Sequence, residues 1–497
     1  MQPDPSATLR GICRDLLERS RACQEAGDAL SGVSLARTAE LLTCLTLRYE
    51  GLPALLHGYQ PQLLELLHES IDLLRRLAFE IPADAQHILQ ESPPRSGDPV
   101  VAFHDRLSLA ISLCLDSLSR ADVDGPDRLT VLRFINKICR AQRDIAHARD
   151  AALAAIRQDC HARGPDDDDT MPSTSLLTET LHKHFPEHAT ACVKSVSRLA
   201  GLNANEVFAL EVEGMPDWPR DCILRRNRGS DWVGNQVSGE YGVLDHMYRA
   251  GLPVPRPLLA GTDLDGPNRP FIILSRVRGR AVRLLEMGDA AASFMRDAAK
   301  VLARIHRVAL TGLDDRYRHY GHTARHRTLT MVQRYHDAWY AEFSEQSLVL
   351  EAAYGWLRVN ADIVDERVCV VHADYSQRNI LSENGQLTAV LDWELAHVGH
   401  PAEDLGYIRP DVEQVMQWND FLQTYLDAGG FDVDDAVIRY FMIYGLAFQM
   451  TTQSVAGKRF MDGSLPNVLI GGVATIEWRE SDRLVCELLL RELQDCA

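Results

Sequence analysis

Residues 370–407 read VVHADYSQRNILSENGQLTAVLDWELAHVGHPAEDLGY and place three polar side chains at the ends of short apolar runs. Asp374 follows a β-branched run, and Asn379 comes five positions later. A turn-rich gap at 382–385 leads into a second apolar run, which ends at Asp392. This order predicts a strand, a loop and a hairpin of two short strands, with the three side chains gathered at one end. Such a cluster can orient a hydroxyl, hold magnesium and counter the charge of a phosphate in transfer.

The spacing resembles the protein-kinase catalytic loop, H-x-D-x-x-x-x-N, followed by a metal-binding Asp on the next hairpin. The segment is more similar to the aminoglycoside phosphotransferase and choline kinase-like family, whose loop usually reads HGDxxxxN. Within that family, LDWELAHVGHPAEDLGY most resembles the kinase domains associated with acyl-CoA dehydrogenases. The resemblance covers roughly residues 176–495. It implies a protein kinase-like two-lobed fold, with a small β-rich N-lobe and a mostly helical C-lobe.

Composition excludes several other classes of protein. The 497 residues allow two or three domains, and 46% hydrophobic with 25% charged residues is an ordinary globular balance. A net charge of −18 argues against nucleic acid as a partner, although a nucleotide needs only a local positive pocket. The eleven Cys form no CxxC pair, so we interpret them as reduced thiols. Without a signal core or a run of about 18 apolar residues, we expect a cytoplasmic protein with no membrane partner.

The pattern along the chain predicts four parts and an α+β fold class. Residues 1–160 carry apolar residues at three- and four-residue spacing, which predicts an all-α helical-bundle domain of unknown function. The acidic, polar stretch at 161–175 predicts a flexible linker. Three strand patterns, a helix and two further strands predict a kinase-like N-lobe at 176–277. The mostly helical pattern at 278–497 predicts the C-lobe, which contains the catalytic loop.

The resemblance assigns the catalytic roles. Asp374 is the candidate catalytic base, because phosphoryl transfer needs a carboxylate hydrogen-bonded to the attacking hydroxyl. Asn379 and Asp392 are the candidate Mg²⁺ ligands, since this ion favours oxygen ligands. Glu394 lies within reach of the same metal, and a solvated or salt-bridged role is about equally favoured.

Three further residues are expected to support the fold of the site. His372 resembles the loop histidine of the family, which is usually structural. Asp404 resembles the helix-borne Asp that braces the catalytic loop through its backbone. His306, on the apolar face of a predicted helix, is interpreted as a satisfied core residue.

In the N-lobe, Arg225 stands where the family places its third-strand lysine, and Arg keeps the charge and can bind phosphate by a fork of donors. Glu240, on the following helix, would orient it through an ion pair. A surface strand with an exposed Arg is the alternative, and the adjacent Arg226 makes the assignment ambiguous. The loop at 201–206 stands where the family has its phosphate loop, which makes Asn205 a candidate nucleotide contact.

Ser275 and Val277 lie in the expected hinge, whose backbone groups would face the purine of the nucleotide. Side-chain identity says little at such positions. We therefore expect Mg²⁺ and ATP as cofactors, with GTP left open.

Four departures from the family pattern stand out. Ala373 replaces the usual Gly, Ala204 replaces the usual Ser, Gln377-Arg378 stands where a Gly often precedes the Asn, and His400 replaces an Asp. None removes a catalytic carboxylate, so an active enzyme is favoured over a pseudokinase.

These observations favour a Mg²⁺-dependent kinase that transfers the γ-phosphoryl group of ATP to the hydroxyl of a small molecule. The acyl-CoA dehydrogenase resemblance suggests a hydroxyacyl-CoA, whose phosphates would meet basic residues at 325–327 or at Arg276, Arg278 and Arg280, although such groups are usually a solvated face. The alternatives are an aminoglycoside or amino-alcohol phosphotransferase and a nucleotide-sensing kinase-like regulatory protein. A homodimer also stays open.

Overall fold

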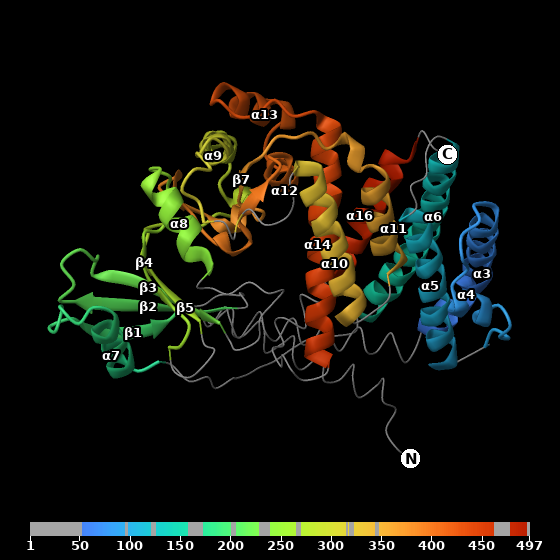
Figure 1. Ribbon diagram of the computed structural model, residues 1–497, viewed down its shortest axis with the longest axis horizontal. Helices are drawn as coiled ribbons and strands as arrows, with labels where there is room; N and C mark the ends of the chain where they lie inside the picture. The colour runs from blue at the N-terminus through green and yellow to red at the C-terminus, as the bar shows by residue number, and fades with distance from the viewer. Residues whose placement is uncertain are drawn as a thin grey trace, which may run out of the picture. The chain divides into compact units, whose positions relative to one another are not determined.

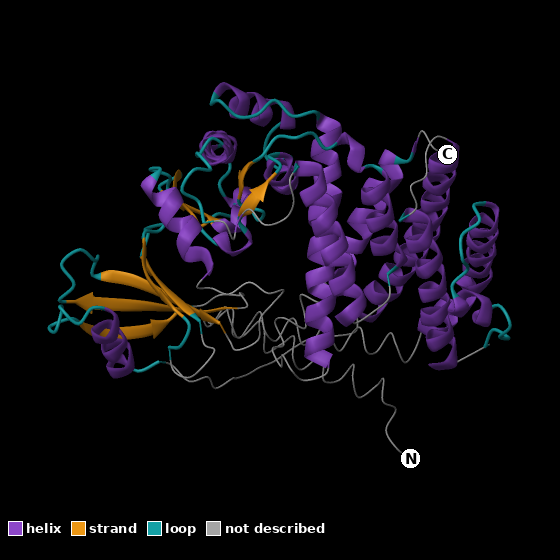
Figure 2. Ribbon diagram, viewed as in Figure 1, coloured by secondary structure: helices purple, strands orange, loops and turns teal. Residues whose placement is uncertain are grey.

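The computed structural model describes residues 52–94, 98–120, 126–157, 172–199, 205–227, 239–264, 270–314, 317, 323–342, 347–461 and 478–494. The chain divides into two compact units. Unit 1 comprises Met1–Asp167, Met331–Asp362 and Leu446–Ala497. Unit 2 comprises Asp168–Thr330 and Ile363–Gly445. Within the described ranges, every strand belongs to unit 2 (Figures 1 and 2).

The described part of unit 1 is helical. Its elements are α3 (Leu52–Arg76), α4 (Ala83–Ile88), α5 (Asp98–Ser119), α6 (Pro126–Arg157), α11 (Leu348–Val359) and α16 (Trp478–Glu492), together with the ends of α10 (Ala324–Glu342) and α14 (Asp435–Met461). Helix α3 packs on α5, α11 packs on both α5 and α6, and α16 packs on α6. Every residue of α11 from Leu348 to Leu357 is buried, as expected for a helix covered on all sides.

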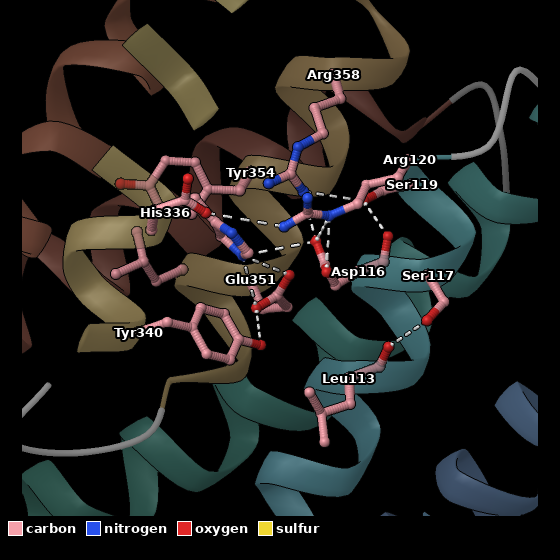
Figure 3. A network of polar contacts seen from close by, with 12 residues as sticks. Leu113, Asp116, Ser117, Ser119, Arg120, His336, Tyr340, Glu351, Tyr354 and Arg358 are labelled. Carbon is pink, nitrogen blue, oxygen red and sulfur yellow. Dashed lines mark hydrogen bonds and ion pairs between the residues drawn. The ribbon is translucent and has the colours of Figure 1, made fainter. Parts of the chain in front are cut away.

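A buried polar network joins α5 to α10 and α11 (Figure 3). Arg358 Nη1 donates to Asp116 Oδ1 at 3.1 Å. Glu351 is fully buried, accepts a hydrogen bond from the Tyr340 hydroxyl at 2.9 Å and lies 3.1 Å from His336 Nε2. Because removing one partner of a buried pair costs about 3–5 kcal/mol, the network favours one register of α5 against α10 and α11.

The compact units cut the chain at other points than the predicted sequence domains do. The amino-terminal helices α5 and α6 pack on α11 and α16, which come from later parts of the chain, and Asn136 Nδ2 donates to the carbonyl of Leu493 at 3.0 Å. The physical reason is that the apolar faces of helices from both ends of the chain are covered by one another. The domain bounds given above stay predictions about sequence modules.

Unit 2 contains a five-stranded antiparallel sheet in the order β1-β2-β3-β5-β4. Its strands are β1 (Cys192–Arg198), β2 (Asn205–Glu213), β3 (Asp221–Asn227), β4 (Pro257–Gly261) and β5 (Phe271–Ser275). Helix α7 (Thr174–His184) packs on β1, and α8 (Glu240–Arg249) contacts β4. Phe208, Leu224 and Phe271 lie in the core of this part of the unit. The three strands, helix and two strands follow the order predicted for the N-lobe.

The remainder of unit 2 is mostly helical, with two small sheets. Its helices are α9 (Ala290–His306), α12 (Ala402–Val412), α13 (Trp418–Asp427) and the first parts of α10 and α14. Strand β7 (Cys369–Val371) pairs with β10 (His397–Gly399), and β6 (Arg280–Ala281) pairs with the hairpin of β8 (Ile380–Glu383) and β9 (Gln386–Val390). Short 3-10 turns are η2 (Leu284–Glu286), η4 (Ala361–Ile363), η5 (Gln377–Asn379) and η6 (Trp393–Leu395). The predicted α+β, kinase-like fold with a preceding helical region is confirmed.

Across the described residues, none of the helices combines the length and the apolar character that crossing a bilayer requires.

Helix α12 and the first part of α14 approach each other closely at Gly406. A Cβ at this position would lie 2.8 Å from the backbone nitrogen of Met442 and 2.9 Å from the carbonyl oxygen of Ile438. Gly58, in α3, has open space around the same position. Replacing each glycine by alanine therefore compares the same substitution at a crowded helical position and at a helical position with free space around it.

We expect Gly406→Ala to lower the free energy of unfolding by about 1–3 kcal/mol, because the added methyl group forces α14 to move. Gly58→Ala should raise it by about 0.5–1 kcal/mol, since Ala restricts the unfolded chain and favours helix. Urea unfolding followed by circular dichroism measures both changes. A stabilised Gly406→Ala variant would contradict the close approach of α12 and α14.

Candidate active site

Arg225 lies at the centre of a buried group of ion pairs that joins β3, α8 and the turn at Asp392. Its Nη1 is 2.7 Å from Glu240 Oε1, and its Nη2 is 2.7 Å from Asp392 Oδ1 and 3.5 Å from Glu394 Oε2. The side chain of Arg225 is 9% exposed and that of Glu240 is 1% exposed. The interpretation of Arg225 as an exposed surface residue is therefore wrong.

The adjacent Arg226 serves another purpose. Successive side chains of a strand point to opposite faces, so Arg225 and Arg226 cannot share a partner on one face. Arg226 pairs with Glu206 of β2 at 2.5 Å and lies over the ring of Phe208, 5.3 Å from its centroid. Strand alternation thus removes the ambiguity between the two arginines.

The group around Arg225 carries more negative than positive charge. Burial raises the pKa of Glu240; the attraction of Arg225 opposes this rise, and repulsion from Asp392 and Glu394 adds to it. Burial by itself lowers the pKa of Arg225, but the three carboxylates hold it above its usual value. Carboxylate oxygens of Glu240, Asp392 and Glu394 all lie within 4.8 Å of one another. A cluster of hard oxygen ligands with excess negative charge suits a divalent cation such as Mg²⁺.

Asp374 and Asn379 are bonded to each other directly. Asn379 Nδ2 donates to Asp374 Oδ2 at 2.7 Å and to the Asp374 carbonyl at 3.0 Å. Burial, followed by the negative charge of Asp392, raises the pKa of Asp374. No donor among the described residues reaches Asp374 Oδ1, although this atom is buried. A buried acceptor without a donor is costly, so Oδ1 is ready to accept a hydrogen bond from a ligand.

The backbone of the catalytic loop is held by Asp404 and His372. Asp404 Oδ2 accepts the His372 N–H at 2.8 Å, and Asp404 Oδ1 accepts the Ala373 N–H at 2.7 Å. His372 Nε2 donates to the Leu391 carbonyl at 2.8 Å, and its Nδ1 accepts the Asp374 N–H at 3.2 Å. His372 thereby ties the loop that carries Asp374 to the residue before Asp392.

His306 holds Asp404 from the other side. His306 Nε2 donates to Asp404 Oδ2 at 3.1 Å, and the Tyr425 hydroxyl lies 2.7 Å from His306 Nδ1. Both His306 and Asp404 are buried. Burial raises the pKa of Asp404, but His306 and the loop N–H groups outweigh it, so the pKa lies below its usual value. The residue interpreted as a core histidine is a hydrogen-bonded core histidine next to the site.

Two residues of the site lie in the left-handed backbone region. Ala373 has φ +66°, and Asp392 has φ +66° and ψ +60°. For residues other than Gly this conformation costs about 1–2 kcal/mol. The positive φ explains why Gly suits position 373. The two hydrogen bonds to Asp404 oppose the strain that Ala373 brings.

The nucleotide-contact candidates are placed less completely. Asn205 begins β2, where its backbone pairs with Asn227, and its side chain lies outside the described residues, as does the loop at 201–204. Ser275 ends β5, and its Oγ accepts the Arg256 N–H at 2.8 Å. Val277 is half-buried just after the strand. Their contacts with a nucleotide stay predictions.

Sequence reasoning gave no role to Tyr407, a half-buried residue near the loop. Burial and the negative charge of Asp374 raise the pKa of Tyr407, which places this hydroxyl beside the candidate base. Tyr407 follows Asp404 by three residues on α12, and that helical spacing was the available signal. His400, the departure noted above, packs its ring on Phe441 at 5.3 Å and lies 3.2 Å from Asp365.

The chain matches a family model and several curated proteins. Residues 195–440 match the phosphotransferase enzyme family, APH. The chain is 30% identical over 230 residues to acyl-CoA dehydrogenase family member 11 of Gallus gallus, which is 45% of this chain and 28% of that protein. The Homo sapiens protein of the same name is 26% identical over 257 residues, 48% of this chain and 31% of that protein. The match therefore spans less than a third of these relatives.

Solved structures with a similar backbone include antibiotic phosphotransferases. One is a thermostable mutant of aminoglycoside phosphotransferase APH(4)-Ia in a ternary complex with ADP and hygromycin B, at 20% identity and a TM-score of 0.44, covering 63% of this chain and 98% of that one. Another is macrolide 2'-phosphotransferase MphH from Brachybacterium faecium, at 15% identity and a TM-score of 0.43, covering 60% and 97%.

The half-buried His397, on β10, provides a test by pH. Its Nε2 lies 3.1 Å from Glu403 Oε2, and its Nδ1 donates to the Leu395 carbonyl at 3.0 Å. Burial by itself lowers the pKa of His397, but the negative charge of Glu403 outweighs burial and raises this pKa from 6.5 to about 9. The stabilising charge is therefore complete below pH 6.5 in the folded protein and is lost as pH rises through about 9.

We expect the free energy of unfolding to fall between pH 6.5 and 9 by a few kcal/mol at most, and the fall to shrink in Glu403→Gln. Gln keeps the hydrogen bond to the His400 N–H but removes the charge. Urea unfolding at several pH values measures the effect, with His87→Gln, in an exposed helical ion pair, as the control. The same slope in wild type and Glu403→Gln would refute the ion pair.

Proposed function

We propose that this chain, whose residues 195–440 match the phosphotransferase enzyme family APH, is a Mg²⁺-dependent kinase that transfers the γ-phosphoryl group of ATP to the hydroxyl of a small molecule. The observation that carries the proposal is the 2.7 Å pair between Arg225 and Asp392, residues 167 positions apart. It brings the candidate phosphate-binding cation and the candidate metal ligand to one place.

Asp374 acts as the catalytic base in this proposal. The acceptor hydroxyl donates its proton to Asp374 as its oxygen bonds to the γ-phosphorus, while the bond from that phosphorus to the β-phosphate oxygen breaks and ADP leaves. The free Oδ1 provides the acceptor, and the raised pKa makes the carboxylate a better base. Asn379 orients Asp374 through its amide N–H group.

Asn379 and Asp392 hold the magnesium ion in this proposal, with Glu394 as a further oxygen ligand. Bound there, magnesium would neutralise phosphate charge in the transition state. The amide nitrogen of Asn379 is engaged with Asp374, which leaves the carboxamide oxygen as its ligand atom. His372 and Asp404 position the loop and do not touch the reacting groups.

Arg225 binds the nucleotide phosphates, and Glu240 orients it from α8. A guanidinium has five N–H donors, so Arg225 can contact phosphate oxygens while it keeps the bond to Glu240. Asn205 and the backbone at Ser275 and Val277 complete the nucleotide site. ATP is the proposed donor; GTP would use the same phosphate contacts.

A hydroxyacyl-CoA is the acceptor that we propose. Two observations support this acceptor. The matched relatives are named as acyl-CoA dehydrogenase family members. A basic segment leads into β6, which pairs with the hairpin of β8 and β9. Arg280 is exposed on β6, where it pairs with Ser382 of β8, and Arg276 and Arg278 precede it. These cations can meet the phosphates of coenzyme A at the hairpin that follows Asn379.

We expect Asp374→Asn and Asp392→Ala each to reduce ATP-dependent phosphorylation by at least about a hundredfold, because they remove the base and a metal ligand. Coupled ADP release measures turnover, and thermal unfolding shows that the variants fold. Asp427→Asn, an exposed acid on α13, is the matched control and should keep wild-type turnover. Near-native turnover in Asp374→Asn would eliminate the proposed mechanism.

The acceptor is tested by ADP release with hydroxyacyl-CoAs, hydroxyacyl-pantetheines, amino alcohols and aminoglycosides side by side. We expect turnover with the CoA thioesters, and a KM about thirtyfold higher in Arg278→Gln/Arg280→Gln, since each of the two lost phosphate contacts costs roughly 1 kcal/mol. Pantetheine thioesters lack the nucleotide phosphates, so their KM should not respond. Turnover of an amino alcohol or aminoglycoside alone would reassign the acceptor; nucleotide binding without any transfer would favour a nucleotide sensor.

A further inference from the structure

A basic hollow lies in unit 2 where α8 and α9 end. Its volume is about 530 Å³, and its polar lining consists of His246 and Arg249 from α8 with Arg304 and Arg307 at the end of α9. None of the candidate active-site residues lines it. Convergence of up to four positive side chains on one hollow is unusual for a chain whose net charge is −18.

Two of these cations are held by neutral groups. Arg304 Nη2 donates to the Gly251 carbonyl at 2.6 Å. Arg307 donates to the carbonyls of Gly429 and Gly430, and its guanidinium lies 4.1 Å from the ring centroid of Phe431. Within the part of the chain that the structure describes, neither arginine forms an ion pair with a carboxylate. Their positive charge is therefore available to a ligand.

The other two side chains add to the positive potential. His246 Nε2 donates to the Ala309 carbonyl at 2.7 Å, which leaves Nδ1 to the hollow or to solvent. Arg249 pairs with Asp245 at 2.9 Å, so its charge is partly neutralised, and its side chain is 77% exposed. Asp245 reduces the positive potential of the hollow, and Arg304 and Arg307 are the main cations of the hollow.

The geometry also explains why the cations stay in place without a ligand. Helices α8 and α9 both end here, and the carbonyl groups at a helix carboxyl terminus attract positive charge. The backbone carbonyls use one N–H of Arg304 and two of Arg307, out of five on each guanidinium. The remaining donors form forks that suit the oxygens of a phosphate group.

We infer that this hollow binds a small phosphate-bearing anion at a second site, separate from the proposed active site. Its volume lies within the range of about 300–1,000 Å³ that small-molecule sites occupy. A dianionic phosphate matches the two arginines that lack carboxylate partners, which a single carboxylate would not neutralise. The site takes a soluble molecule, since its cations surround a hollow.

The helices that line the hollow also carry residues of the proposed active site. Helix α8 begins at Glu240, which contacts Arg225, and α9 ends at His306, which holds Asp404. His306 lies between Arg304 and Arg307 in the sequence. A ligand that bridges α8 and α9 therefore contacts the two elements that place Glu240 and Asp404. Binding itself does not depend on the proposed kinase activity.

Titration calorimetry of the full chain with inorganic pyrophosphate tests the site. The nucleotide site is filled beforehand with a non-hydrolysable ATP analogue and magnesium, and wild type should then bind one pyrophosphate. Arg304→Gln/Arg307→Gln should weaken this binding at least tenfold. Arg296→Gln, an exposed arginine on α9 that does not line the hollow, is the matched control and should bind as wild type does.

The double variant also removes bonds to three backbone carbonyls, so two further measurements keep the test independent of its folding. Arg249→Gln leaves those bonds intact and should weaken binding about two- to threefold. In wild type, pyrophosphate should slow the modification of Arg304 and Arg307 by phenylglyoxal, as mapped by mass spectrometry, and leave Arg296 unchanged.

Three outcomes would overturn the inference. The first is equal weakening in Arg296→Gln and in the double variant, which would mean general surface attraction. The second is wild-type binding in a folded double variant, or no protection of Arg304 and Arg307. The third is binding to vesicles of phosphatidylcholine and phosphatidylserine with none of soluble pyrophosphate, which would assign the cations to a lipid surface.

Discussion

One fully buried carboxylate, that of Asp404, constrains the candidate site. It accepts the backbone N–H groups of His372 and Ala373, and His306 donates to it from α9. Without these bonds, two peptide groups of a buried loop would lack acceptors, and Ala373 would have less to hold it at a positive φ. The position of Asp374, the next residue, follows directly from this anchoring.

The anchoring extends in one chain of polar contacts. His372, on the loop, donates to the carbonyl of Leu391. Asp392, which follows Leu391, pairs with Arg225, and Arg225 pairs in turn with Glu240 on α8. Each member is buried or half-buried, so the loss of one leaves a charge or a donor without its partner. The loop, the hairpin turn and the sheet therefore hold one arrangement together. The excess negative charge at its centre is the feature that a cation relieves.

Much of the candidate site could be predicted from local sequence, because the meeting of its residues depends on short spacings along the chain. The five-residue interval from Asp374 to Asn379 and the turn before Asp392 predict that the three meet, and strand alternation separates Arg225 from Arg226. The partners of the helices could not be predicted. Periodicity shows that a helix buries one face, but not what covers it. The pairing of α5 and α6 with α11 and α16 depends on non-local packing, and so does the buried contact of Glu351 with His336.

The discontinuous core of unit 1 has a consequence for synthesis on the ribosome. Asn136 of α6 bonds to Leu493, 357 residues later, and Cys486 Sγ donates to the Cys139 carbonyl. The amino-terminal helices emerge first but gain these partners last, whereas the segments of unit 2 are complete once Gly445 has been made. The apolar faces of α5 and α6 thus stay partly uncovered while the intervening chain is translated. Such a nascent chain is exposed to aggregation and to chaperones for most of its synthesis.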